Sequence, residues 1–426
     1  MRIGFVDNSG SLFSVAWHVK GEGHGVRYVI QEEAEEEKVI GEGLVEHTTL
    51  DELIKWNPDA ILTYKSSKAA EKLTKAKIPN FGSSQWADKL EDDRLYAANI
   101  VKEYSSGVLP DTHKFNSAEE ARDFLHESGK RHDWVFKADG AGGVDVSTTH
   151  VTKSRDHLLA VLDYEEQRGS KRFVLQQKVE GVEVDIEGWY DYEHGWLMPI
   201  NSTLERKYLM SGDNGPMSGC MGSIVWPWKG DRPLLFRQTI EHLTPFLEKI
   251  KYRGPLSQNN IIDFKSRKPH WLEFTPRLGW NAFEALMYGY IGSIGEFIVN
   301  FAKGQAQPMR FRGSYCGAIR VYCPAAPNIP VFAPLREDSR FYPKDLWSTG
   351  ADDERQLFTV GCEALNGFTP ILECCAVGDS VKEVTRELYE DVIPQIEVTD
   401  ITFRDDIGEQ ACKDLEMLKN WGYVVE

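Results

Sequence analysis

The sequence predicts an α/β protein that opens with a parallel β-sheet, and two observations carry this prediction. Strand-like and helix-like segments alternate through roughly the first 85 residues, which is typical of parallel strands joined by crossover helices. In addition, 41% of the 426 residues are apolar and 27% are charged, so the chain can bury a large core and divide into more than one compact unit.

The N-terminal elements follow in regular order. Strands are expected at RIGFVD (2–7), VRYVI (26–30), DAILTY (59–64) and IPNFG (78–82). Helices are expected at SLFSVAWHVK (11–20), TLDELIKW (49–56) and SKAAEKLTKAK (67–77). We therefore place the first domain at residues 1–85.

The rest of the chain changes character twice. A helix over 92–104 leads into a small α/β stretch with strands WVFK (134–137) and RFVLQQKV (172–179), and the strand VEVDIEGWY (182–190) opens a segment with a helix-rich end. Strands around YCGAIRVY (315–322) and PILECCAV (370–377) and the helix SVKEVTRELYEDV (380–392) form a last α+β unit. The boundaries predicted are 86–305 and 306–426.

Composition excludes several classes of protein. A formal net charge of −17 disfavours stable binding to DNA or RNA, because cations that neutralise phosphates supply most of that affinity. No apolar run approaches the ~20 residues needed to cross a bilayer, and the start MRIGFVDNSG lacks the features of a secretory signal, so we expect a cytoplasmic protein. The seven cysteines form no CxxC pair, which argues against a disulfide framework or a zinc site, and Cys374 and Cys375 are expected in the core.

The first chemical motif is WVFKADGAGG (134–143). A strand delivers Lys137 beside Gly140, Gly142 and Gly143, and glycines let successive backbone N–H groups point at one phosphate. A simple hairpin turn is the alternative, and the chain has no Walker-A sequence.

The second motif is FVLQQKVEGVEVDIEGWY (173–190), in which one strand turns into another that begins near Glu183. The edge of such a strand can meet a purine, and the carboxylate can accept ribose hydroxyl groups. An ordinary hairpin is the alternative.

The third motif is SGDNGPMSGCMG (211–222), preceded by Glu205, Arg206 and Lys207. Its glycines, proline and small residues predict a loop that closes over a ligand, and the two basic residues favour an anionic one. A mobile surface loop is the alternative.

The fourth motif is a predicted hairpin that carries Asp263 and Glu273 on its two strands, joined by KSRKP. Carboxylates opposite one another can bind Mg²⁺ between a protein and nucleotide phosphates. Glu273 lies among apolar neighbours and needs a partner, either a metal or Arg277. Arg277 in turn suits bidentate recognition of a carboxylate or phosphate.

In this order the motifs resemble the ATP-grasp carboxylate–amine ligases, and among them the glycinamide ribonucleotide synthetases (phosphoribosylamine–glycine ligases) of purine biosynthesis. KADG, VEGVE, GPMSGCMG, LEFTPRLG and FRDDIG (403–408) carry the resemblance, which spans nearly the whole chain. It implies the ATP-grasp fold, with a Rossmann-like pre-ATP-grasp domain, an ATP-grasp domain whose small mobile lid covers about 110–178, and a C-terminal α+β domain.

The resemblance also implies roles for individual residues. Phosphates of ATP would be bound by Lys137 and the glycines after it, with Arg94 where the family usually has a second lysine. Gln176, Gln177, Lys178 and Val179 would form the adenine-binding edge, and Glu183 would hold the ribose. Mg²⁺ or Mn²⁺ would be held by Glu273, with Asp263 nearby and Thr275 in the place of an asparagine. Arg277, Lys207 and Arg206 would act on the reacting groups.

Departures from the family pattern concentrate around its substrate site. DNSGSLFSVAW replaces the family's Arg-Glu-His loop, TYKSSKAAE replaces Gly-Pro-Glu, and Trp280, Asn281 and Ala282 follow Gly279 where the family has Asp-Pro-Glu. Trp280 suggests a more apolar or aromatic substrate, while Lys65, Ser66 and Ser67 are free to meet an anion.

These features favour an ATP-dependent ligase with altered specificity that joins a carboxylate, such as an amino acid, to an amine through an acyl phosphate. The alternative is a catalytically silent relative that binds ATP as a sensor or scaffold. Small-molecule substrates are the expected partners, and the chain is expected to be a monomer or a homodimer.

Overall fold

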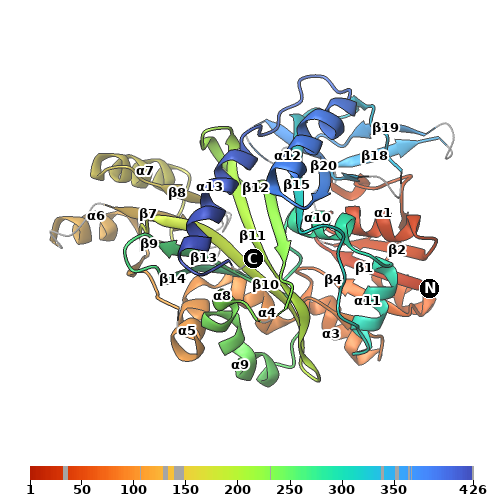
Figure 1. Cartoon of the computed structure of the whole chain (residues 1–426), viewed down its shortest axis with the longest axis horizontal. Coiled ribbons are helices and arrows are strands. Elements are labelled where there is room, and N and C mark those ends of the chain that lie inside the picture. Colours follow the sequence, from red (N-terminus) through yellow and green to blue (C-terminus); the bar gives the residue numbers. More distant parts are fainter. Residues whose placement is uncertain are drawn as a thin grey trace.

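The computed structural model describes residues 1–31, 37–105, 107–127, 133–138, 148–230, 232–336, 340–350, 355–362, 365 and 367–424. Figure 1 shows three β-sheets in succession, with the red N-terminal sheet at the right, a small sheet at the left and long strands between them. A fourth, three-stranded sheet lies near the C-terminal strands. In the described part of the chain, no helix combines the length and apolarity needed to span a membrane.

The N-terminal sheet is entirely parallel, with strand order β3-β2-β1-β4-β5. Its strands are β1 (Arg2–Asp7), β2 (Gly25–Ile30), β3 (Glu46–His47), β4 (Ala60–Thr63) and β5 (Asn80–Phe81). Its crossover helices are α1 (Phe13–Gly21), α2 (Leu50–Trp56) and α3 (Ser67–Lys75). Helices α2 and α3 share an apolar cluster with one face of the sheet, whereas α1 packs with residues of the other face. The predicted parallel sheet is therefore confirmed.

The small sheet has its own core. Its order is β6-β9-β7-β8, from β6 (Thr112–Phe115), β9 (Phe173–Gln177), β7 (Trp134–Ala138) and β8 (Thr149–Val151). Helices α6 (Ala118–Glu127) and α7 (Arg155–Gln167) cover it. Phe136 and Phe173 stack at the centre with ring centroids 4.7 Å apart, in an apolar cluster separate from the main core. This unit is joined to the first sheet by α4 (Gln85–Asp92) and α5 (Arg94–Tyr104).

The central sheet has eight strands, and every adjacent pair is antiparallel. In spatial order they are β14 (Pro269–Thr275), β13 (Arg253–Asp263), β10 (Gly181–Asp191), β11 (Gly195–Met210), β12 (Asn214–Pro227), β15 (Tyr315–Pro324), β20 (Phe368–Gly378) and β17 (Phe341–Pro343). Strands β12 and β15 pair directly, so the sheet is continuous across residue 305. The division of the chain into three domains remains a prediction.

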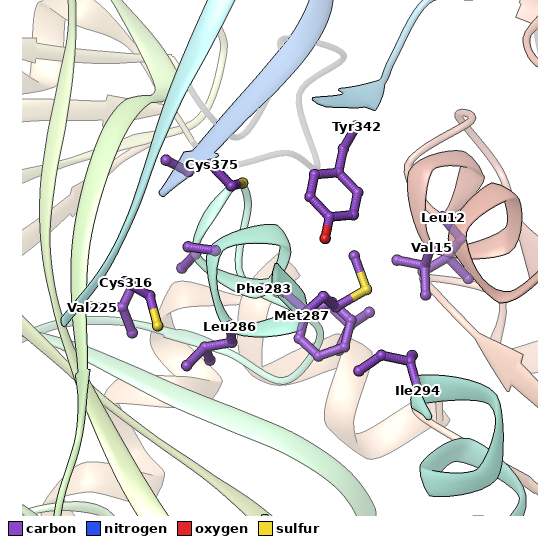
Figure 2. Packing of buried hydrophobic residues seen from close by; sticks show 14 of the residues in the cluster. Leu12, Val15, Val225, Phe283, Leu286, Met287, Ile294, Cys316, Tyr342 and Cys375 are labelled. Carbon is purple, nitrogen blue, oxygen red and sulfur yellow. The ribbon is translucent and has the colours of Figure 1, made fainter. Parts of the chain in front are cut away.

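The main core lies between this sheet and the helices around it. These are α8 (Leu234–Gln238), α9 (Thr244–Lys249), α10 (Ala282–Gly289), α11 (Ile294–Ala302), α12 (Val381–Arg386) and α13 (Ile407–Asn420). The three-stranded sheet is β16 (Pro330–Val331), β19 (Gln356–Thr359) and β18 (Leu346–Thr349). Figure 2 shows Cys316 and Cys375 packed beside α10. Cys374 and Cys375 are fully buried there, which confirms their predicted place in the core.

The predicted loop over residues 211–222 is wrong. Instead, β11 and β12 form a hairpin, and the glycine-rich segment supplies its tight turn and the start of the second strand. Gly212 has a φ of 72°, a left-handed conformation that suits glycine in a turn. Gly219 is needed for close approach, because a Cβ there would lie 1.9 Å from the Trp280 ring. The small residues therefore permit packing within a strand.

Candidate functional site

One face of the central sheet carries a row of polar side chains. Side chains alternate along a strand, so Glu183, Asp185 and Glu187 of β10 share this face. The strand register sets Asp185 opposite Asn259 of β13, and Asn259 opposite Glu273 of β14. Three neighbouring strands thus bring oxygen-bearing side chains into line.

Two cations lie close to Glu273 at the end of this row. Lys207 Nζ is 3.6 Å from Glu273 Oε1, and an Arg94 guanidinium nitrogen is 3.6 Å from Oε2. Lys207 also lies 2.7 Å from Glu183. Burial by itself would raise the pKa of Glu273, but the charges of Lys207, Lys137 and Arg94 lower it to about 2. Glu273 is therefore an ionised carboxylate, and 41% of its side chain remains exposed.

Lys137 approaches the same place from the small sheet. It is buried on β7, and Arg94 links the two units because its Nε donates to the carbonyl oxygen of Ala138 at 3.4 Å. Burial lowers the pKa of Lys137 to about 7, and the neighbouring charges of Arg94 and Lys207 contribute to the lowering. Gly140, Gly142 and Gly143 lie outside the described residues.

The same face holds carboxyl groups that the sequence analysis did not select. Burial raises the pKa of Asp185 well above its ordinary value, raises that of Glu187 to about 7 and raises that of Glu205. The alternation in EVDIE, on a strand that was predicted, was the signal that could have identified Asp185 and Glu187. The charge of Lys207 lowers the pKa of Asp185 and of Glu205, but it does not offset the effect of burial.

The expected pairing of Asp263 with Glu273 is not observed. Asp263 stands opposite Gly181, and its carboxylate accepts the backbone N–H groups of Lys265 and Ser266 in the hairpin turn. Asn259 is the residue across from Glu273, and its buried Oδ1 has no hydrogen-bond partner among the described residues.

Thr275 lies two positions after Glu273 on the same face of β14. Glu273, Asn259 and Thr275 therefore gather oxygen atoms of the kind that bind Mg²⁺. Asn259 was missed because its place depends on the strand register.

Arg277 makes an ion pair, but with a partner that was not foreseen. Its Nε lies 3.1 and 3.0 Å from the two carboxylate oxygens of Glu91 in α4. Glu91 also accepts Lys65 at 3.1 Å, so the expected free cation at Lys65 is paired. The guanidinium of Arg277 lies over the rings of Tyr64 and Trp280, with centroid distances of 5.3 and 5.7 Å.

Arg206 does not join the other predicted residues. It alternates with Glu205 and Lys207 along β11, so its side chain points to the opposite face, where it pairs with Asp414 of α13. Of the two basic residues upstream of the glycine-rich hairpin, Lys207 is the one that reaches the polar row.

The proposed adenine-binding segment forms the end of β9 and the residues after it. Gln176 is buried, and its side-chain amide donates to the Thr112 hydroxyl. The backbone N–H groups of Gln177 and Lys178 donate to the carbonyl oxygens of Asp111 and Asp133. Other groups of the segment, such as its carbonyl oxygens and Val179, would have to recognise a purine.

A pocket of about 440 Å³ lies beyond Arg277, between the N-terminal sheet, α10 and the C-terminal strands. Trp280 forms part of its wall, and its Nε1 donates to the Tyr64 hydroxyl at 3.0 Å. Two buried ion pairs, Arg320 with Glu373 and Lys344 with Glu284, lie at the pocket. Sequence reasoning gave no sign of either pair, because each joins segments far apart in the chain.

Comparisons with known proteins find relatives among the ATP-grasp ligases. The family model of the ATP-grasp (A) domain of phosphoribosylglycinamide synthetase matches residues 93–281. A phosphoribosylamine–glycine ligase of Lactococcus lactis is 28% identical over 388 residues, which cover 85% of this chain and 87% of the relative. The relative from Methanopyrus kandleri is 26% identical over 243 residues, so the chain spans about half, 53%, of that relative's length.

The fold agrees over a longer stretch than the sequence does. The crystal structure of the phosphoribosylamine–glycine ligase of Thermotoga maritima matches with a TM-score of 0.69 at 18% identity, and the match covers 95% of this chain and 100% of that chain. The chain therefore has the ATP-grasp fold, and its residues 93–281 are similar to the ATP-grasp (A) domain of phosphoribosylglycinamide synthetase.

Proposed function

We propose that this protein is an ATP-dependent ligase that joins a carboxylate, such as an amino acid, to an amine through an acyl phosphate. The observation that supports this most directly is the convergence of Lys207 and Arg94 on Glu273, with Lys137 buried beside them. Cations arranged around one ionised carboxylate suit a nucleoside triphosphate that binds as its complex with a divalent metal ion. The relatives' names agree with such an activity.

The residues of the polar row fit a magnesium ion. Glu273 is ionised, the Oδ1 of Asn259 is buried without a partner among the described residues, and Thr275 adds a hydroxyl on the same face. Such hard oxygen ligands suit Mg²⁺ or Mn²⁺. The bound metal would neutralise charge on the transferred phosphate.

The protein's own groups would work by position and charge. A carboxylate oxygen of the acid attacks the γ-phosphorus of ATP, the bond to the bridging oxygen breaks, and ADP leaves. The amine nitrogen then attacks the acyl carbon, phosphate leaves, and the nitrogen loses a proton as the amide forms. Lys207 and Lys137 would stabilise the charge that develops on the phosphoryl oxygens.

Arg277 would act at the entrance to the pocket that has Trp280 in its wall. Its guanidinium is held by Glu91 and lies between the nucleotide side and Trp280. A group fixed in this way can orient an incoming carboxylate through its remaining N–H donors.

Trapping with hydroxylamine tests this function without knowledge of the amine. The full-length protein is incubated with Mg-ATP, hydroxylamine and each of a panel of amino acids, and both ADP and the hydroxamate are measured. Equal amounts of ADP and hydroxamate with at least one acid would support the acyl phosphate. Magnesium-dependent nucleotide binding without product from any acid would instead favour the silent sensor or scaffold.

A further inference from the structure

The pocket beside Trp280 holds its cations in tight internal ion pairs. Arg320 contacts Glu373 at 2.5 Å, and the same guanidinium lies over the Trp280 ring at 4.9 Å from the centroid. Lys344 pairs with Glu284, which is buried and also accepts the hydroxyl of Ser14. Neither cation can leave its carboxylate without leaving a buried charge unpaired, so the charge of each cation is already balanced within the protein.

The described lining is acidic on balance. Two further carboxylates, Glu37 and Asp345, line the pocket together with Arg320, Lys344 and Glu284. Asp345 is partly buried and accepts a hydrogen bond from the Thr369 hydroxyl at 3.1 Å. A phosphate dianion in this pocket would meet more carboxylates than free cations.

The N-terminal turn, which also lines the pocket, is closed to anions as well. A turn between a parallel strand and its helix often binds phosphate through backbone N–H groups. Here the buried carboxylate of Asp7 accepts those N–H groups from Ser9, Gly10 and Leu12, at 3.3, 3.1 and 2.6 Å. Asp7 also accepts the hydroxyl of Tyr28 at 2.7 Å. The turn thus carries its own internal anion.

Apolar side chains form much of the remaining wall, which also includes Ser9, Ser11 and Ser218. Figure 2 shows Leu12 and Val15 on one side, facing α10, which carries Phe283. All three of these residues line the pocket, and Trp280 adds an aromatic surface that is 36% exposed. Such walls suit the hydrocarbon body of a ligand, and the surrounding carboxylates suit an ammonium group.

We infer that this pocket binds an amine substrate that carries no phosphate group. The ligand is an organic amine whose apolar or aromatic body packs against Trp280 and whose ammonium group meets Asp345. The inference rests on the proposed function for the identity of the ligand as the amine that is acylated. The inferred amine differs from the substrate of relatives whose names specify a phosphoribosylated amine.

Calorimetry with a matched pair of ligands tests the inference independently of turnover. Tyramine and O-phosphotyramine are titrated separately into the full-length protein saturated with Mg-ADP. Tyramine is expected to bind about tenfold more tightly, because the phosphate meets carboxylates rather than free cations. Equal or tighter binding of O-phosphotyramine, or no binding of either ligand, would overturn the inference. Failure to form a hydroxamate, by contrast, would count only against the ligase activity.

Two variants assign the preference to the pocket. Trp280→Ala is expected to weaken tyramine binding about tenfold through lost aromatic contact, while Trp86→Ala, a control on exposed α4, leaves it unchanged. Asp345→Asn keeps the hydrogen-bond acceptor for Thr369 but removes one negative charge. The ratio of tyramine affinity to O-phosphotyramine affinity should therefore fall several-fold. Unchanged tyramine affinity in Trp280→Ala, together with unchanged selectivity in Asp345→Asn, would place the bound amine elsewhere.

Discussion

The region around Glu273 and the pocket beside Trp280, for which we propose nucleotide and amine binding, hold their cations differently. Near Glu273, Lys207 and Arg94 sit 3.6 Å from the carboxylate, and no carboxylate of the described residues lies within 4.0 Å of the Lys137 amine. In the pocket, Arg320 is held by Glu373 at 2.5 Å. Glu273 is 41% exposed, so the cations around it can also meet an incoming phosphate, whereas Arg320 pairs with a fully buried carboxylate. The difference shows that basic residues alone do not identify an anion site.

Loss of the central carboxylate should have the largest effect. In Glu273→Gln, three cations lose their common partner and the metal loses a charged ligand, so turnover should fall about 1000-fold. Coupled measurement of ADP release checks this. Glu71→Gln on the exposed surface of α3 is the matched control. Activity within tenfold of the parent protein would remove Glu273 from the metal site.

Loss of Lys207 should come next. Lys207→Met keeps most of the side-chain length but leaves Glu183 and Glu205 without their cation, so turnover should fall about 100-fold. Because Arg94 and Lys137 remain, nucleotide binding should weaken less than turnover. Stopped-flow binding beside steady-state rates separates the two, and equal losses in both would assign Lys207 to ground-state binding.

Nucleotide affinity should depend on pH through Lys137. Its pKa is about 7 in the free protein, and phosphates would raise it in the complex. Binding therefore takes up a proton, and affinity should be highest below pH 7 and fall by up to about tenfold per unit as pH rises above it. Calorimetry in buffers with different ionisation enthalpies measures the proton uptake. Lys137→Arg should abolish it, and persistent uptake would point to another group.

The smallest effect on nucleotide binding is expected for a substitution of Arg206, on the opposite face of β11. Arg206→Met leaves the buried carboxylate of Asp414 without its cation, which should lower the free energy of unfolding by about 2 kcal/mol while leaving magnesium-dependent nucleotide affinity unchanged. Denaturant unfolding and calorimetry measure the two quantities. Weakened nucleotide binding in a folded Arg206→Met protein would restore the role first predicted for it.

Local patterns predicted the parallel sheet and several long strands because hydrophobic periodicity decides both. The segment 211–222 was misinterpreted, since its small residues serve packing against Trp280, a contact that composition does not reveal. Lys137, Lys207, Arg94 and Glu273 were selected through motifs, and the structure brings them together.

The partners that complete the site could not be foreseen in the same way. Glu91 beside Arg277 comes from another part of the chain, and Asn259 beside Glu273 depends on strand register. Both relations are set by tertiary contacts, on which a single sequence carries little information.

The continuous central sheet also constrains how the chain can be divided. Strand β15 covers the hydrogen-bonding edge of β12 from Gly222 to Val225. A fragment ending near residue 305 would bare that edge, together with the apolar surface beneath it, and exposed edges of this kind template intermolecular pairing. We expect such a truncated polypeptide to precipitate on expression, so dissection of this protein calls for point substitution rather than deletion.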